Sequence, residues 1–112
     1  MIIKTEDYII DSSTINKVII SGSMRLPSPL SYDQPFSLIK KALDDCIDTL
    51  NIDLQDLEYL NSSGITSLAR IIIQARKDDK TLKFIISNDI PWQNKTFSSL
   101  KILWDKLIIE AT

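Results

Sequence analysis

Apolar residues recur every three or four positions in three stretches of the chain, and this spacing places them on one face of a helix. The stretches cover residues 36–50, 62–77 and 97–108. Their apolar positions are Ile39, Ala42, Leu43, Cys46, Ile47 and Leu50, then Ile65, Leu68, Ala69 and Ile72, and finally Phe97, Leu100, Leu103, Trp104, Leu107 and Ile108. Three helices are therefore expected. Ile71 and Ile73 widen the apolar stripe of the second helix, which leaves room for self-association.

Short runs rich in β-branched residues lie between these helices and indicate strands. The runs are Tyr8–Ile10 and Lys17–Gly22, which flank a polar turn as in a hairpin, then Asn51–Leu54, Leu82–Ile86 and a short final run at Leu107–Glu110. Strands that are joined through helices favour parallel neighbours with right-handed crossovers. The prediction is one α/β domain over residues 1–112, with the order β-β-α-β-α-β-α and a small mixed sheet on which helices pack.

The composition removes several classes of function. The net charge is −2 and no basic stripe is present, so nucleic-acid binding has little support. The chain has no histidine and one cysteine, Cys46, which we expect to be buried on its helix. Asp53, Asp56 and Glu58 have no recognised metal spacing and are interpreted as a solvated turn. We therefore expect no catalytic site, no metal and no cofactor.

The sequence also gives an expectation about location. The start of the chain carries Glu6 and Asp7 where a secretory leader has a basic region and a long apolar core. No apolar run approaches the roughly 18 residues that span a bilayer. The expected location is the cytoplasm.

Asn61-Ser62-Ser63-Gly64 immediately precedes the apolar pattern of the second helix. Asn and Ser cap helix N-termini, where several backbone N–H groups lack partners. The same end of a helix attracts anions, so a phosphate on Ser62 or Ser63 would be tolerated. A serine here can therefore be a cap or a switch, and residue types alone favour the cap. For Gly64 we expect close packing of the helix start against its strand.

The segment from Asn51 to Arg76 resembles a STAS domain, the fold of the bacterial anti-sigma factor antagonists. That family has an Asp-Leu strand, a polar turn, a hydrophobic pair and then Asp-Ser-Ser-Gly before a helix; here Asp53-Leu54 leads to Asn61-Ser62-Ser63-Gly64-Ile65. The order of elements is similar over nearly the whole chain. Pro91-Trp92-Gln93 resembles a segment of standalone bacterial members. The family's Asp before the serines is Asn61 here, and Asn caps a helix about as well.

The resemblance implies a partner switch centred on Ser62, the serine that a partner kinase phosphorylates in this family. The dephosphorylated form would bind a kinase-like anti-sigma regulator, and a PP2C-type serine phosphatase would reset the system, so the protein itself would catalyse nothing. The expected partner-binding residues are Asn61, Ser62, Ser63, Gly64, Ile65 and Trp92. Trp92 could instead cover the core edge beside Trp104. The alternative function is a STAS binding module without phosphate chemistry, either a structural subunit of a transport complex or a small-ligand sensor.

Overall fold

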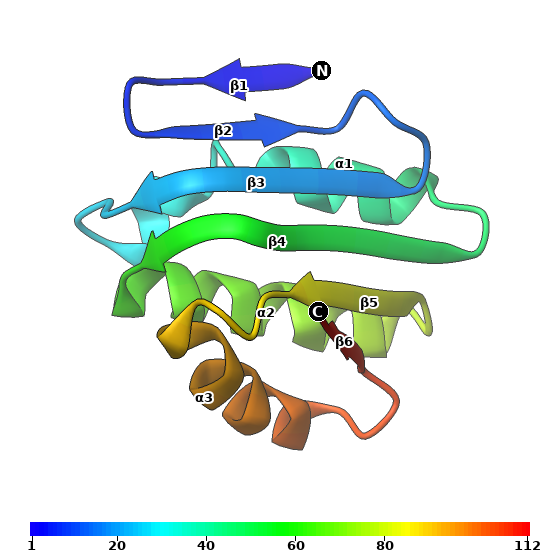
Figure 1. Ribbon diagram of the computed structural model, residues 1–112. Coiled ribbons are helices and arrows are strands. Elements are labelled where there is room, and N and C mark those ends of the chain that lie inside the picture. Colours follow the sequence, from blue (N-terminus) through cyan, green and yellow to red (C-terminus); the bar gives the residue numbers. More distant parts are fainter.

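The computed structural model describes residues 1–112 and contains one six-stranded sheet whose strands lie side by side in sequence order (Figure 1). The strands are β1 (Ile2–Lys4), β2 (Tyr8–Asp11), β3 (Lys17–Met24), β4 (Thr49–Leu60), β5 (Thr81–Ile86) and β6 (Ile108–Ala111). The first three strands pair antiparallel, and β3 to β6 pair parallel. The predicted α/β class with a mixed sheet is confirmed, and β1 is an additional edge strand.

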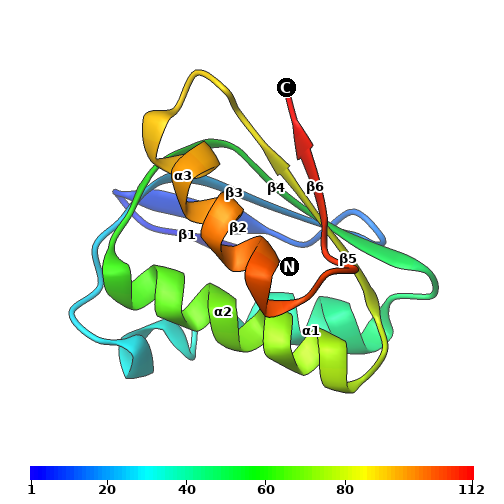
Figure 2. The same cartoon turned by 90° about the horizontal axis from the view of Figure 1, so that it is seen from below.

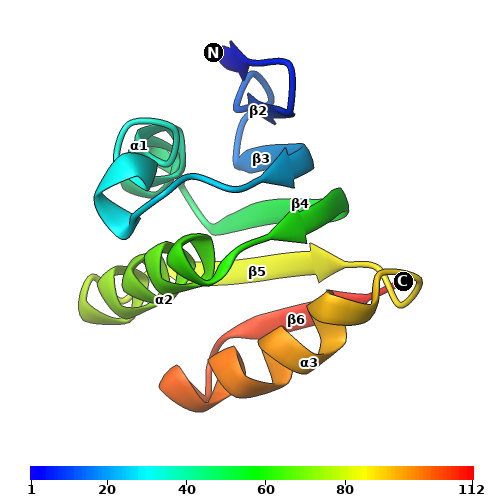
Figure 3. The same ribbon diagram turned by 90° about the vertical axis from the view of Figure 1, so that its left-hand side faces the viewer.

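Helices connect the parallel strands. They are α1 (Ser37–Asp45), α2 (Ser62–Lys77) and α3 (Pro91–Leu100), with short 3-10 turns η1 (Pro29–Tyr32) and η2 (Lys101–Leu103). α1 and α2 lie side by side on one face of the sheet, and α3 crosses obliquely near β5 and β6 (Figures 2 and 3). The ring centroids of Phe97 in α3 and Phe84 in β5 are 4.9 Å apart. None of the helices combines the length and the apolar character needed to cross a lipid bilayer.

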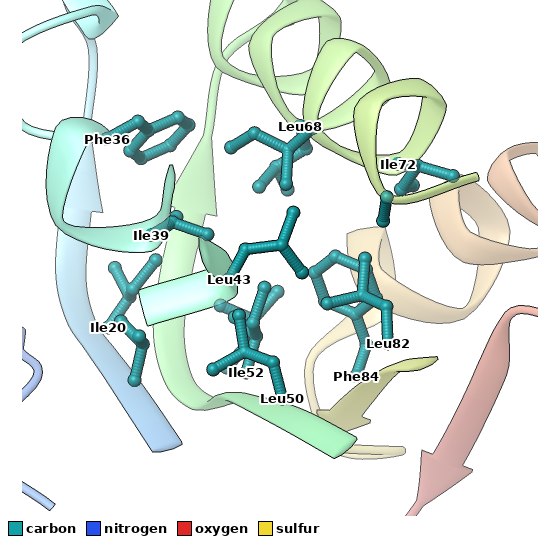
Figure 4. Packing of buried hydrophobic residues seen from close by; sticks show 14 of the residues in the cluster. Ile20, Phe36, Ile39, Leu43, Leu50, Ile52, Leu68, Ile72, Leu82 and Phe84 are labelled. Carbon is teal, nitrogen blue, oxygen red and sulfur yellow. The ribbon is translucent and has the colours of Figure 1, made fainter. Parts of the chain in front are cut away.

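A core of 26 buried side chains fills the space between the helices and the sheet. Alternation along the strands directs every second residue into it: in β3, Val18 and Ile20 are buried while Ile19 is only half-buried. Leu68 and Ile72 of α2 meet the strands from the other side (Figure 4). Burial of this stripe explains why the helical pattern of residues 62–77 was predictive.

The first helix is shorter than its apolar spacing predicted. It ends at Asp45, and Cys46 already has an extended backbone. Two acidic residues at a helix C-terminus oppose its dipole, and Leu50 is taken into β4, where it alternates with Ile52. The predicted burial of Cys46 is confirmed, and its Sγ donates to the Leu43 carbonyl.

β4 is much longer than the predicted Asn51–Leu54, and residues 55–60 are strand instead of a turn. At two register shifts against β3, β4 contains an extra residue. These residues interrupt the alternation of apolar and polar positions, so the sequence pattern did not indicate a strand there. Asp53, Asp56 and Glu58 therefore lie in a strand, not in a turn. The Asp53 carboxylate accepts a hydrogen bond from the Gln55 amide and lies 3.9 Å from Lys17 Nζ. No group of three or more potential metal ligands is present.

The last helix begins earlier than predicted. Pro91 occupies its first turn, and the helix ends at Leu100. Trp104 and Leu107 lie in an irregular loop after the helix, and both side chains are buried. Their spacing along the chain is the same as that of apolar residues on a helix, which explains the prediction. The Lys101 ammonium donates to the Asp105 and Leu107 carbonyls and closes this loop. The expected final strand is present as β6, displaced by one residue.

Candidate functional site

Asn61 caps the N-terminus of α2. Its backbone is extended (φ −76°, ψ 174°), and its Oδ1 accepts a hydrogen bond from the Gly64 N–H at 3.1 Å. The Asn61 carbonyl accepts the first intrahelical bond, from Ile65 N. The cap predicted for this segment is therefore supplied by the asparagine and by neither serine.

The other side of the Asn61 amide fixes the loop that follows β3. Its Nδ2 donates to the Leu26 carbonyl at 2.8 Å, and its Oδ1 also accepts from the Tyr32 hydroxyl at 2.6 Å. These partners define the amide orientation, because Gly64 N–H can only donate and the Leu26 carbonyl can only accept. Burial raises the pKa of Tyr32, opposed by the hydrogen bond from Leu26 N–H to its oxygen. One residue thus joins β3, η1 and α2.

Gly64 packs as predicted. A Cβ built at this position would lie 2.2 Å from Leu60 Cδ1 and 2.9 Å from Tyr32 Cζ. Every larger residue would push the helix start away from the end of β4. Gly64 therefore sets the close approach of α2 to the sheet.

Ser62 is exposed at the first helical position, and its hydroxyl has no hydrogen-bond partner within the chain. Ser63 is half-buried, and Ile65 is half-buried against the core. Thr66, one turn further along, is exposed, and its hydroxyl donates back to the Ser62 carbonyl at 3.0 Å. Of the motif residues, Ser62 presents the most accessible free hydroxyl.

The first turn of α2 carries no charged side chain, and in particular no acidic residue. The nearest cation along the neighbouring strand is Arg25, which follows β3 and stacks over the Tyr59 ring at 4.4 Å. Leu30, in η1, is 76% exposed beside α2 and was not predicted as a surface residue. An anion on Ser62 would therefore meet the positive end of the helix without a competing carboxylate on that turn.

Trp92 and Gln93 have structural contacts at the same end of β4. Trp92 is half-buried against the core with its ring centroid 6.5 Å from that of Phe97, and its indole N–H donates to the Glu58 carbonyl at 2.9 Å. Gln93 is fully buried: Nε2 donates to the carbonyls of Leu54 (2.7 Å) and Leu57 (2.9 Å). The pairing of β4 with β5 stops at Asp53, so these two side chains satisfy backbone carbonyls beyond the end of β5.

Two residues that organise the site were absent from the sequence prediction. Tyr32 and Gln93 are polar side chains that do not belong to an apolar stripe. The Tyr32 hydroxyl donates to the Asn61 side chain, and Gln93 donates to two backbone carbonyls, all far away in sequence. For Gln93 the sequence held two signals: its place in the Pro91-Trp92-Gln93 segment, and Pro91 itself, which marks a helix start and so places Gln93 in a first turn.

Comparison with known proteins shows likeness in structure and none in sequence. No family model and no curated protein matches the chain. A chain in the crystal structure of the diguanylate cyclase SiaD with its activator SiaC, from Pseudomonas aeruginosa, has a TM-score of 0.70 at 15% identity, covering 100% of this chain and 99% of that chain. Apo-SiaC of the same organism gives a TM-score of 0.68 at 14% identity, with 99% of both chains covered. A further SiaC structure gives 0.66 at 15% identity, over 98% of this chain and 95% of that one. At this identity the likeness establishes a shared fold.

Proposed function

We propose that this protein is a partner-switching regulator of the STAS type, in which phosphorylation of Ser62 controls binding to a kinase-like partner. The observation that carries the proposal is that Asn61, and not a serine, caps α2. Because Asn61 forms the capping hydrogen bond, the exposed Ser62 hydroxyl is not needed to cap the helix. In this proposal the protein acts by binding and not by catalysis.

A phosphate on Ser62 would leave the fold intact. It adds about −1.5 to −2 charges at neutral pH. Near the positive end of a helix that charge is favourable by about 0.3–1 kcal/mol. The first turn of α2 has no acidic side chain to repel it.

The same phosphate would weaken a fitted interface. A partner that covers Ser62 must remove water from the phosphate and bring its own surface against the new charge. A loss of about 2.8 kcal/mol in the complex is a hundredfold loss of affinity, since about 1.4 kcal/mol is a factor of ten. In this switch the phosphate prevents the partner from binding, and the protein itself does not refold. A PP2C-type phosphatase would remove the phosphate and restore binding.

The fold comparisons support a role in binding a regulatory partner. The similar protein SiaC is described as an activator and is bound to an enzyme in one of these structures. The exposed Leu30 lies in η1, which packs on α2, and the Arg25–Tyr59 pair lies where β3 and β4 end, just before α2; they offer an apolar and an aromatic contact of the kind that recognition surfaces use. These residues extend the expected partner-binding set of Asn61, Ser62, Ser63, Gly64, Ile65 and Trp92.

The test is incubation of the purified protein with ATP and its cognate serine kinase, read by intact mass. Wild-type protein should gain the mass of one phosphate group, and Ser62→Ala should gain none. Thr66→Ala is the matched control, because Thr66 is exposed on the same helix one turn away, and it should be phosphorylated like the wild type. Ser62→Asp should stay folded and lose the partner, whereas Ser62→Ala should bind it constitutively. Full phosphorylation of Ser62→Ala would overturn the assignment.

The same comparisons favour a second candidate, an activator that binds a nucleotide cyclase without being phosphorylated itself. SiaC is named as the activator of a diguanylate cyclase. In that case Ser62→Ala and Ser62→Asp would bind the partner enzyme equally well in a calorimetric titration. A difference of tenfold or more between the two variants favours the switch.

A further inference from the structure

Two isoleucines project into solvent at the end of the domain opposite Ser62. Ile15, in the turn between β2 and β3, is 75% exposed, and Ile47, in the loop between α1 and β4, is 85% exposed. Both loops lie together on the right of Figure 1, away from the start of α2 on the left. Clustered exposed apolar side chains mark interaction sites more often than single ones do.

Asn16 fixes the two loops to each other. Its Oδ1 accepts a hydrogen bond from Ile47 N at 3.3 Å, and its carbonyl accepts from Asn51 N at 2.9 Å. Its backbone is in the left-handed region at φ 58°, a conformation that Asn tolerates better than most residues. Asn16 therefore ties the loop that carries Ile15 to the loop that carries Ile47.

A hollow of about 250 Å³ opens beside them. Its apolar lining includes Ile15, Leu38, Ala42 and Cys46, and its polar lining includes Lys41 and Asp45. Lys41 Nζ lies 3.1 Å from the Asp45 carboxylate, and both side chains are largely exposed. One small surface thus combines an apolar protrusion, a hollow whose lining is half apolar and half polar, and one charge of each sign.

We infer that this surface, formed by Ile15, Ile47 and the adjacent hollow, joins two copies of the chain in a symmetric dimer. A two-fold interface brings a surface against itself, so it requires a surface that is self-complementary. Here the protruding Ile47 of one protomer fills the hollow of its partner, and Lys41 faces the partner's Asp45. Ser62 lies at the far end and stays accessible in both protomers, so the inference is independent of the proposed function.

The surface is small, and the dimer should therefore be weak, with a dissociation constant on the order of 10–100 µM. Sedimentation velocity over roughly 1–500 µM protein should show a monomer–dimer equilibrium. Ile47→Asp and Ile15→Asp should each raise the dissociation constant at least tenfold. Both positions are exposed, so both variants should fold.

Ile102→Asp is the matched control, since Ile102 is 86% exposed on η2, outside this surface. It should dimerise like the wild type. Lys41→Asp and Asp45→Lys should each weaken the dimer, and the charge-swapped double variant should restore it. A monomer at every concentration, or a dimer that survives Ile47→Asp and Ile15→Asp, overturns the inference.

Discussion

Replacing Gln93 by leucine tests whether the hydrogen bonds from the first turn of α3 to the backbone of β4 stabilise the fold. Gln93 is fully buried, and it makes three hydrogen bonds: Nε2 to the carbonyls of Leu54 and Leu57, and Oε1 from Ser87 N–H at 2.8 Å. The pairing of β5 with β4 runs only as far as Asp53, so Gln93 bonds to these two carbonyls beyond the end of that pairing. Leucine fills a similar volume and removes all three bonds.

The expected loss follows from the groups left behind. A buried polar group that loses its partner costs about 1–3 kcal/mol, and Gln93→Leu leaves three such groups. Some would recover a water molecule, so we expect a destabilisation of about 3–5 kcal/mol. That is a large part of the roughly 5–15 kcal/mol by which a domain of this size is stable.

Urea unfolding followed by tryptophan fluorescence measures this loss, because Trp92 is adjacent in sequence and packs against the core. The control is Gln74→Leu, since the Gln74 amide bonds only the exposed Asp78 carboxylate, and this variant should stay within about 0.5 kcal/mol of the wild type. If Gln93→Leu also unfolds within 1 kcal/mol of the wild type, the three hydrogen bonds do not hold this end of β4 as argued.

The remaining predictions concern the start of α2. Gly64→Ala should destabilise by about 1–3 kcal/mol, because its Cβ meets the Leu60 side chain at 2.2 Å, as thermal unfolding can measure. Asn61→Ala should cost about 2–4 kcal/mol, the cap together with two abandoned partners, whereas Ser62→Ala should cost less than about 0.5 kcal/mol; equal losses in chemical denaturation would contradict the assignment of the cap. The raised pKa of Tyr32 means that the native state holds its proton where the unfolded state has lost it, so stability should fall as pH rises above about 10. Tyr32→Phe should lose that component of the alkaline dependence.

The sequence was a good guide where one face of an element is buried and the other is solvated. The stripe of Leu68 and Ile72 marked α2, and alternation marked β5 correctly to within a residue. It was a poor guide in β4, whose second half carries Asp56 and Glu58 and changes period at two bulges. Asp56 and Glu58 are exposed in β4, on the face of the sheet that no helix covers. Acidic residues are compatible with a strand whose one face is in water, so they were wrongly interpreted as a turn.

The sequence predicted the position of the site but not the hydrogen bonds that hold it together. Asn, Ser and Gly in that order indicate a helix start, and Gly64 packs as expected. The hydrogen bonds of Gln93 and Tyr32 reach 36, 39 and 29 residues along the chain, and such partners have no local signature. Trp92 was left open between a partner anchor and a core edge; its contacts with Phe97 and the Glu58 carbonyl favour the core edge, while its half-exposed surface remains available at the same end as Ser62.

Asn61 stands where the STAS pattern that this segment resembles has an aspartate, and the asparagine has a physical reason in this chain. An aspartate at position 61 could still accept from the Gly64 N–H and from the Tyr32 hydroxyl, but it could not donate to the Leu26 carbonyl, which lies 2.8 Å from Nδ2. The carboxylate would face that carbonyl instead, and the loop after β3 would lose this hydrogen bond to the residue that caps α2. The amide therefore serves the fold and leaves the helix start without a negative charge. A phosphate on Ser62 would then be the only negative charge on the first turn of α2, so phosphorylation would change the charge of that turn from zero to about −1.5 to −2.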